Sequence, residues 1–500
     1  MQGRTGSRSG VLQWVVVLVV GVVVVAIVLG LSLIPRLSDG QKVLDGARPA
    51  FAPERVAGDR AGINIISQNV DMANPIVTAK GGGAAEVPAI VSYVAQEQHI
   101  SAPQALALLR KNFPHTTALL QAIPLSSVSA ELPGLEAFLE KTLKLTPAQL
   151  TAALKANFPA LYQSIANLPT VTRGWDNIPN IGGLTRFNGT PVTDVPQLRT
   201  YFSSDLIPVV EHQRANFASL DSKTSINWIA PLLLIVGIVV ILFAAVMIVR
   251  NRRGVSSREA LASAIVVPVV GVVVVALVLV ISLIPRVSDG QKLLDGLRPA
   301  NTAARVHGDR VGINMVSAIV NAEDPIMTAA GGGAAEVPKL VAFVSKKTGL
   351  SQSAVLAALQ KNFPHTTALL QAIPISSVNA ELPALVGFLT PAVLTKIPAL
   401  TPTVLNAQAV TTGWNKVPGT AGVTNFQGAP IRTVPQVRKY FSNDVVPVLE
   451  TQRANYDNLV STSKIDFLGP LVLIIGIVVI VYGLLMVFLA RRSRPRREQG

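Results

Sequence analysis

The residues that could do chemistry in this chain are few, and their spacing matches no catalytic motif. The chain has no cysteine, which excludes zinc sites built on thiolate ligands. Its histidines form no HExxH or other closely spaced metal pairing: they are His99, His115, His212, His307 and His365. We therefore predict no catalytic residue, no metal site and no cofactor, in a protein that is not an enzyme.

Two repeated segments partly resemble catalytic or phosphate-binding motifs but do not match them. His115 precedes two threonines, and the same triplet recurs at His365; without a GxSxG elbow, we favour helix capping over a base paired with a hydroxyl. The segment GGGAAEVP, at Gly81 and Gly331, lacks the Walker lysine and the GxGxxG spacing of phosphate loops. We interpret it as a flexible joint before a helix that opens near Glu86.

Long apolar runs flank the segments that contain these residues. Half of the 500 residues are hydrophobic, 14% are charged and the mean hydropathy is +0.46, as in membrane proteins. Four uncharged runs can each cross a bilayer, so we predict spans at residues 11–35, 228–249, 261–285 and 467–490. The first run exceeds the h-region of a signal peptide, and its near copy lies mid-chain, so we interpret it as a retained anchor.

Arginines predict the orientation of these spans. The short segments 1–10, 250–260 and 491–500 hold eleven arginines against Glu259 and Glu498, a net charge of +9 out of +15. The positive-inside rule places these segments in the cytoplasm and residues 36–227 and 286–466 outside a plasma (inner) membrane. Because most of the excess charge is topological, nucleic-acid binding loses its support.

Internal repetition is the strongest signal in the chain. Residues 21–138 recur at an offset of 250, including the identical KNFPHTTALLQAIP at Lys111 and Lys361. After an eleven-residue deletion in the second copy the offset becomes 239, which aligns Trp175 with Trp414. We infer a tandem duplication of a unit made of a span, an outer domain and a span.

Helical spacing dominates the two long segments. Capping boxes pair Ser101 with Gln104 and Thr146 with Gln149, and each NFP triplet is typical of a boundary between two helices. The predicted fold is an all-α integral membrane protein with four transmembrane helices and two homologous α-helical extracytoplasmic domains. Without cysteine, apolar packing must stabilise these domains.

The segments that follow the predicted spans carry signals for further helices and for loops. Pro35 and Pro285 should end the first span of each copy, and Ser38-Asp39 should cap the helix that follows. Arg55 and Asp59, four residues apart, predict a solvated helix face. Pro/Gly/Asn-rich loops supply the candidate ligand contacts Trp175, Phe187, Trp414 and Phe426.

Small residues form a stripe at seven-residue spacing on the second span of each copy. The stripe consists of Ala230, Gly237, Ala244, Gly469, Gly476 and Gly483. Such a stripe lets helix backbones approach closely, either within the chain or against a separate membrane partner, and we favour packing within the chain.

The leading hypothesis is a non-enzymatic cell-envelope protein whose paired outer domains bind a protein partner or an apolar, lipid-like ligand, in a scaffold, accessory or sensory role. The alternative is a subunit of an envelope export system, because the layout resembles that of large export permeases without their central helices or intramembrane acidic relay. A membrane-bound hydrolase with no visible motif is the third. Expected partners are the lipid bilayer, a membrane or envelope protein and further copies of the chain, but no nucleic acid.

Overall fold

The computed structural model describes residues 6–221, 225–253, 257–389, 395–460 and 467–492. Within these ranges the chain is helical, and its extended contacts are two isolated bridges, Thr185 with Pro191 and Thr424 with Pro430. The all-α prediction is confirmed for these residues. Parts of the predicted cytoplasmic segments, including Arg494, Arg496 and Arg497, lie outside them.

The chain divides into two compact units, and each contains parts of both sequence copies. The span unit consists of Met1–Phe51, Val210–Asn301 and Val448–Gly500. The interleaved unit consists of Ala52–Val209 and Thr302–Pro447. Both copies of the predicted outer domain therefore contribute to a single interleaved unit.

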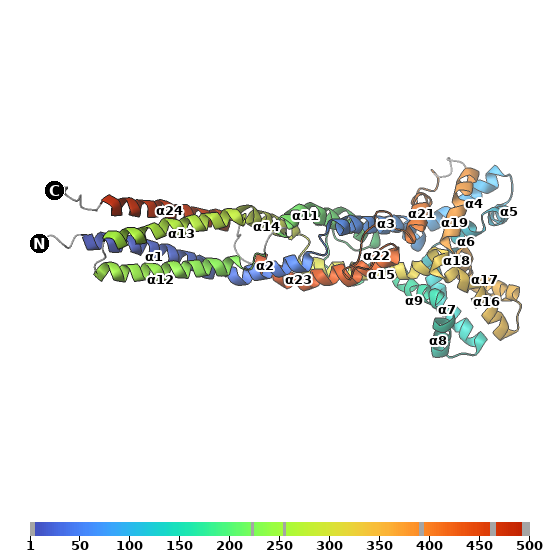
Figure 1. The fold of residues 1–500 in the computed structure, drawn as a ribbon. Helices are drawn as coiled ribbons and strands as arrows, with labels where there is room; N and C mark the ends of the chain where they lie inside the picture. Colours follow the sequence, from blue (N-terminus) through green and yellow to red (C-terminus); the bar gives the residue numbers. More distant parts are fainter. Residues whose placement is uncertain (1–5, 222–224, 254–256, 390–394, 461–466, 493–500) are drawn as a thin grey trace, which may run out of the picture. The chain divides into compact units, whose positions relative to one another are not determined.

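Four long helices dominate the span unit and run side by side, with the start of α1 and the end of α24 at the same end (Figure 1). They are α1 (Gly6–Gly30), α12 (Ile229–Arg253), α13 (Ser257–Val280) and α24 (Leu468–Arg492). The helices pair as two hairpins, α1 with α12 and α13 with α24. Each hairpin thus joins the two predicted spans of one copy.

Three described helices are long and apolar enough to cross a membrane alone, at Val11–Gly30, Ile229–Arg253 and Leu468–Leu489. Two bent helix pairs raise the number to five if each is one span: Ala264–Val280 with Leu283–Leu297, bent by 46°, and Pro364–Ala372 with Ile375–Leu389, bent by 82°. The first pair overlaps the predicted third span. These helices are those of a multi-pass membrane protein.

The prediction for the end of the first span was wrong in detail. The helix breaks at Ser32 and Ser282, which adopt the left-handed conformation (φ 49° and 51°), three residues before each proline. Pro35 and Pro285 instead lie in the first turn of α2 (Leu33–Ala47) and α14 (Leu283–Leu297), where a missing N–H costs little. Ser38-Asp39 therefore lies inside α2 and caps no helix.

The short helices of the span unit contact one another both within and between the copies: Gly46 of α2 lies against Gln452 of the second copy, and Gly296 of α14 lies against Gln213 of the first. Phe51, just after α2, stacks on Phe217 of α11 (Ile207–Asp221) with ring centroids 4.4 Å apart. Arg48 pairs with Asp221 at 2.7 Å. α14 meets α23 (Val446–Val460) through a hydrogen bond from the Tyr456 hydroxyl to the Leu294 carbonyl.

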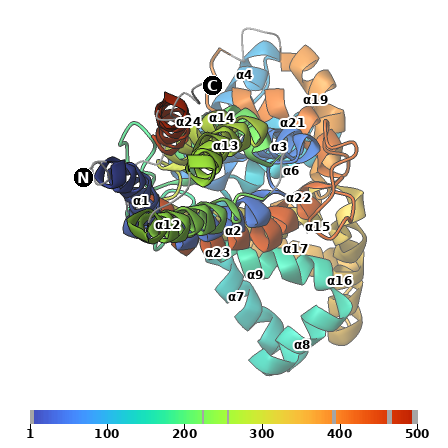
Figure 2. The same ribbon diagram turned by 60° about the vertical axis from the view of Figure 1, so that its left-hand side comes forward.

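Helices of the two copies alternate in the interleaved unit. α3 (Pro53–Val77) packs against α21 (Thr401–Trp414) of the second copy, and α15 (Ala303–Met327) packs against α9 (Pro159–Gly174) of the first. α6 (Pro114–Ala122) and α18 (Pro364–Ala372) pack against each other. Figure 2 shows α3 beside α21. Each copy therefore completes its core with helices of the other.

Half-buried glutamates reinforce this exchange. Glu381 accepts hydrogen bonds from the His115 and Thr116 amides at the start of α6, and Glu131 does the same for α18 at His365 and Thr366. A carboxylate at a helix N-terminus satisfies free N–H groups and complements the helix dipole. The sequence predicted helix capping at these triplets, but it did not predict that glutamates of the opposite copy supply the capping groups.

The remaining helices complete the interleaved unit. They are α4 (Gly83–Glu97), α5 (Ala102–Asn112), α7 (Leu125–Leu143), α8 (Pro147–Asn157), α16 (Gly333–Thr348), α17 (Gln352–Asn362), α19 (Ile375–Leu389), α10 (Val195–Thr200) and α22 (Val434–Tyr440). Capping boxes at the starts of α5 and α8 are confirmed. π-helical segments follow α10 at Tyr201–Leu206 and α22 at Phe441–Val445.

The glycine-rich segment is a tight turn rather than a flexible joint. Gly82 adopts φ 85°, which favours glycine, and ends a short 3-10 turn at Ala79–Gly81. A side chain at Gly81 would collide with the Asn74 carbonyl. The same turn recurs at Gly332 with φ 89°, so close backbone approach explains the glycines of both copies.

Candidate functional site

An apolar cavity of about 200 Å³ lies between the two hairpins of the span unit. All four long helices line it, and Val20 of α1 and Val270 of α13 occupy equivalent positions in the two copies. Its other lining residues are apolar as well, apart from Tyr482, whose hydroxyl donates to the Gln13 carbonyl. Since an apolar cavity of about 150 Å³ can bind benzene, this one has room for hydrocarbon.

A second, smaller cavity of about 100 Å³ lies further along the same helices. It is lined by α2 and α14 together with residues of α11, α12, α23 and α24. On α1 and α13, the buried residues Val28 and Val278 lie between the positions that line the first cavity and those that line the second. A layer of packed aliphatic side chains therefore separates the two cavities.

Two buried arginines distinguish the second cavity from the first. Arg36 and Arg286, at equivalent positions of the two copies, line it with only 7% and 3% of their surfaces exposed. Arg286 donates from Nη2 to the Leu220 carbonyl at 2.9 Å, and Arg36 donates to the Leu459 carbonyl at 3.2 Å. Both carbonyls lie at the C-terminal ends of helices, where a cation is favoured.

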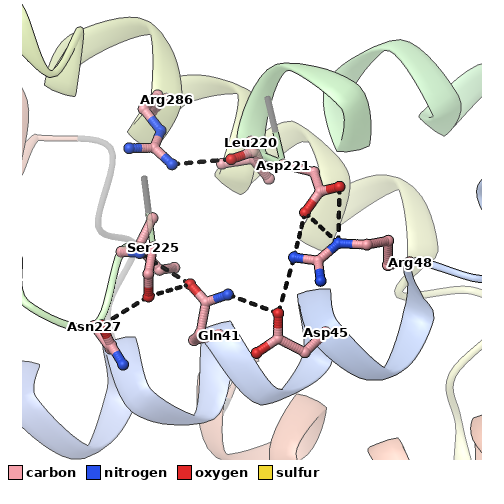
Figure 3. Close-up of polar contacts among 9 residues, drawn as sticks. Gln41, Asp45, Arg48, Leu220, Asp221, Ser225, Asn227 and Arg286 are labelled. Atoms are coloured by element: carbon pink, nitrogen blue, oxygen red, sulfur yellow. Dashed lines mark hydrogen bonds and ion pairs between the residues drawn. The ribbon is translucent and has the colours of Figure 1, made fainter. Parts of the chain in front are cut away.

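A polar pocket of about 280 Å³ adjoins the second cavity and shares Leu44, Leu220 and Arg286 with it. Figure 3 shows its polar network. Gln41 accepts from Ser225 and donates to Asp45, while Arg48 bonds to both Asp45 and Asp221. The described part of the span unit thus contains two apolar cavities. The lining of the second includes two arginines, and this cavity adjoins a pocket lined by polar and charged side chains.

The sequence did not single out the two arginines, although a signal was present. In both copies the long uncharged run ends in Pro-Arg, at Arg36 and Arg286. Pro-Arg alone indicates the edge of a membrane. Arg36 and Arg286 line one cavity because helices of the two copies pack together around it.

The small-residue stripe faces helices of the same chain. A Cβ atom at Gly237 would lie 2.8 Å from Val25 of α1, and one at Gly476 would lie 2.8 Å from Val275 of α13. Gly469 and Gly483 meet Ile284 and Pro268 in the same way, and Ala230 and Ala244 are fully buried. The stripe therefore holds each hairpin together.

The four aromatic residues predicted as ligand contacts lie in the interleaved unit with protein partners. Trp175 and Trp414 are fully buried, and their indole N–H groups donate to Asn74 and Asp324 at 2.9 and 2.8 Å. The rings of Phe187 and Phe426 each lie under an arginine of the other copy, Arg305 at 4.9 Å and Arg55 at 5.0 Å.

Buried carboxyl groups lie beside these aromatic contacts. Asp59 and Asp309 are 6% and 2% exposed, so the predicted solvated face around Asp59 was wrong. Burial raises the pKa of each to about 7, against the lowering effects of Tyr440 and Arg55 on Asp59 and of Tyr201 and Arg305 on Asp309. Burial also raises the pKa of Glu323, which accepts from Asn69 at 2.6 Å, to about 8.

Among the described residues, no group of three or more His, Cys, Asp or Glu side chains is placed to hold a metal ion. No family model, curated protein or solved structure matches this chain.

Proposed function

We propose that this chain is a non-enzymatic multi-pass membrane protein that binds an apolar or lipid-like ligand between its two span hairpins. The observation that supports the proposal is the cavity of about 200 Å³ lined by apolar side chains of all four long helices. Each hairpin is tightly packed through its small-residue stripe, whereas the space between the hairpins is not filled by protein side chains. Hydrocarbon is the material that suits such a space.

The ligand then lies between the spans rather than in the outer domains. The chain retains an accessory or sensory role, with the arginine-rich segments in the cytoplasm and the interleaved unit outside the plasma membrane. With a lipid bound between the hairpins, the distance between the two hairpins would depend on the lipid composition of the bilayer.

Filling the cavity tests this proposal. Phenylalanine at both Val20 and Val270 should occupy the space and reduce the lipid that remains bound after gentle detergent extraction, as measured by native mass spectrometry. The matched control is phenylalanine at Val22 and Val272, which are 47% and 54% exposed and leave the cavity unchanged. Wild-type protein without bound lipid, or equal loss in both double variants, would contradict the proposal.

A further inference from the structure

We propose that the cavity between the two hairpins binds the terminal segment of a single acyl chain of a bilayer lipid, and that the lipid headgroup stays outside this cavity. The inference rests on the proposed function, in which the cavity holds an apolar or lipid-like ligand. It adds the chemical class of the bound group, one hydrocarbon chain, and the part of the lipid that the protein contacts.

Packed side chains close the cavity at both ends of the four long helices, which run side by side (Figure 1). At the end that holds the start of α1, a cluster takes one buried residue from each helix: Trp14, Ala244, Ala264 and Met486. A second cluster does the same beyond the other end of the cavity: Val28, Leu233, Val278 and Val472. On every helix the residues that line the cavity lie between these two positions, so a ligand does not enter along the helices.

Close packing within each hairpin directs entry to the space between the hairpins. A Cβ atom at Gly21 of α1 would lie 2.8 Å from Ile241 of α12, and one at Gly271 of α13 would lie 2.8 Å from Ile480 of α24. Each hairpin therefore leaves no passage between its own two helices. A ligand enters sideways, and in a bilayer the material on that side is lipid hydrocarbon.

The cavity lies at the middle depth of the spans. Its lining residues run from Val16 to Val24 in the span Val11–Gly30, and from Ile475 to Tyr482 in the span Leu468–Leu489. Because the hydrocarbon core of a bilayer is about 30 Å thick, its middle lies about 15 Å from the headgroups on either side. Acyl chains end at this depth, so the terminal part of a chain is the part that reaches the cavity.

Volume and length together fit one chain. From Val16 to Val24 a helix rises by about 12 Å, and an extended chain that advances about 1.2 Å per bond covers this length in about ten bonds. Since a cavity of about 150 Å³ holds the six carbon atoms of benzene, the 200 Å³ found here holds about eight carbon atoms. The two values agree for one extended chain, whereas two chains side by side need about twice the volume.

The lining offers nothing to a headgroup. It includes no charged residue among those described, and the hydroxyl of Tyr482 already donates to the Gln13 carbonyl at 3.0 Å. A buried polar group without a hydrogen bond costs free energy, and a phosphate or carbonyl oxygen finds no free donor here. Methylene groups fill the same space without this cost.

Bromine atoms on the acyl chain test the proposal, because bromine quenches tryptophan fluorescence only at short range. Trp14 is a natural reporter: it is 2% exposed, and its ring centroid lies 5.5 Å from that of Phe243, which lines the cavity. The full chain is reconstituted in phosphatidylcholine with bromine near the end of one acyl chain, and comparison with Trp14→Phe isolates the signal of Trp14. Since every lipid carries bromine, mass action fills the cavity and we expect this signal to fall about twofold.

Three comparisons accompany this measurement. Bromine near the glycerol end of the chain should quench Trp14 much less, because that part stays near the headgroups. Phosphatidylglycerol with the same terminal bromine should quench as strongly as phosphatidylcholine. Phenylalanine at both Val20 and Val270 should restore the signal of Trp14, whereas phenylalanine at the exposed Val22 and Val272 should not.

The outcomes separate this inference from the proposed function. Equal quenching from both bromine positions, or quenching that differs between the two headgroups, overturns the inference. Bound apolar mass in native mass spectrometry without quenching identifies another apolar molecule as the occupant, which overturns the inference and leaves the proposed function intact. Neither bound lipid nor quenching contradicts both. If the filled variant does not fold, the two bromine positions in the wild type still decide.

Discussion

At the scale of single residues, the interleaved unit places acids where water does not reach them. Asp59 and Asp309 occupy equivalent positions on α3 and α15, and each faces a tyrosine of the opposite copy. Because burial raises both pKa values to about 7, folding favours the protonated carboxyl. Between the unfolded pKa near 3.8 and the folded value, the native chain holds protons that the unfolded chain has released.

This proton balance predicts the pH dependence of stability. The contribution of each carboxyl is fully present below about pH 4 and is lost as the pH rises to 7, by up to about 4 kcal/mol per group. Replacing both Asp59 and Asp309 with asparagine should therefore raise the stability at pH 8, leave it unchanged at pH 4 and flatten the decline between them. Thermal unfolding across this pH range measures the effect.

Asp45→Asn provides the control, because Asp45 is about half exposed beside Arg48. It should leave the pH dependence of unfolding as it is in the wild type. A double asparagine variant less stable than the wild type at pH 8 would show that the carboxylates are compensated in the native state.

At the scale of elements, the hairpins of the span unit depend on backbone contact. The stripe residues of α12 and α24 touch α1 and α13 at distances that leave no room for a larger side chain. Without a hydrophobic force between helices in lipid, this close packing is a main source of their association.

A leucine at Gly476 tests the contact. It should force α24 away from α13 and lower the stability in detergent by about 1 to 3 kcal/mol, the usual effect of overpacking. Val481→Leu is a control of similar hydrophobicity, because Val481 is 62% exposed. Thermal unfolding of both variants in the same detergent measures the difference, and an equal effect of the two substitutions would rule out the packing role.

At the scale of the whole molecule, interleaving constrains topology independently of the arginines. α3 and α21, and likewise α15 and α9, come from different copies yet pack in one unit. We therefore expect the parts of this unit that come from the two copies to lie on the same side of the membrane.

Single cysteines can test this arrangement in a chain that has none of its own. Lys111 and Lys361 are exposed and equivalent, so a cysteine at either should react with a membrane-impermeant thiol reagent in intact cells. A cysteine at Asn251, near the end of α12, should react only after lysis. Labelling at only one of the two lysine positions would contradict the interleaved unit, and labelling at position 251 in intact cells would reverse the orientation.

The sequence by itself determined where the long apolar helices lie and several of the signals that begin the shorter ones. Uninterrupted runs of Val, Ile and Leu predict apolar helices wherever they fold, and local signals such as the capping box at Ser101 act within one turn. The stripe at Gly476 was also visible, because helical spacing fixes which residues share a face.

Only the tertiary structure decided which copy each helix joins and which charges become buried. Arg55 and Asp59 have the spacing of a solvated face, yet α3 lies against helices of the second copy and Asp59 is buried. Arg36 and Arg286 are 250 positions apart, and no local pattern records that they line one cavity. Copies that share long identical segments also offer equivalent partners within and between copies, so their exchange depends on long-range packing.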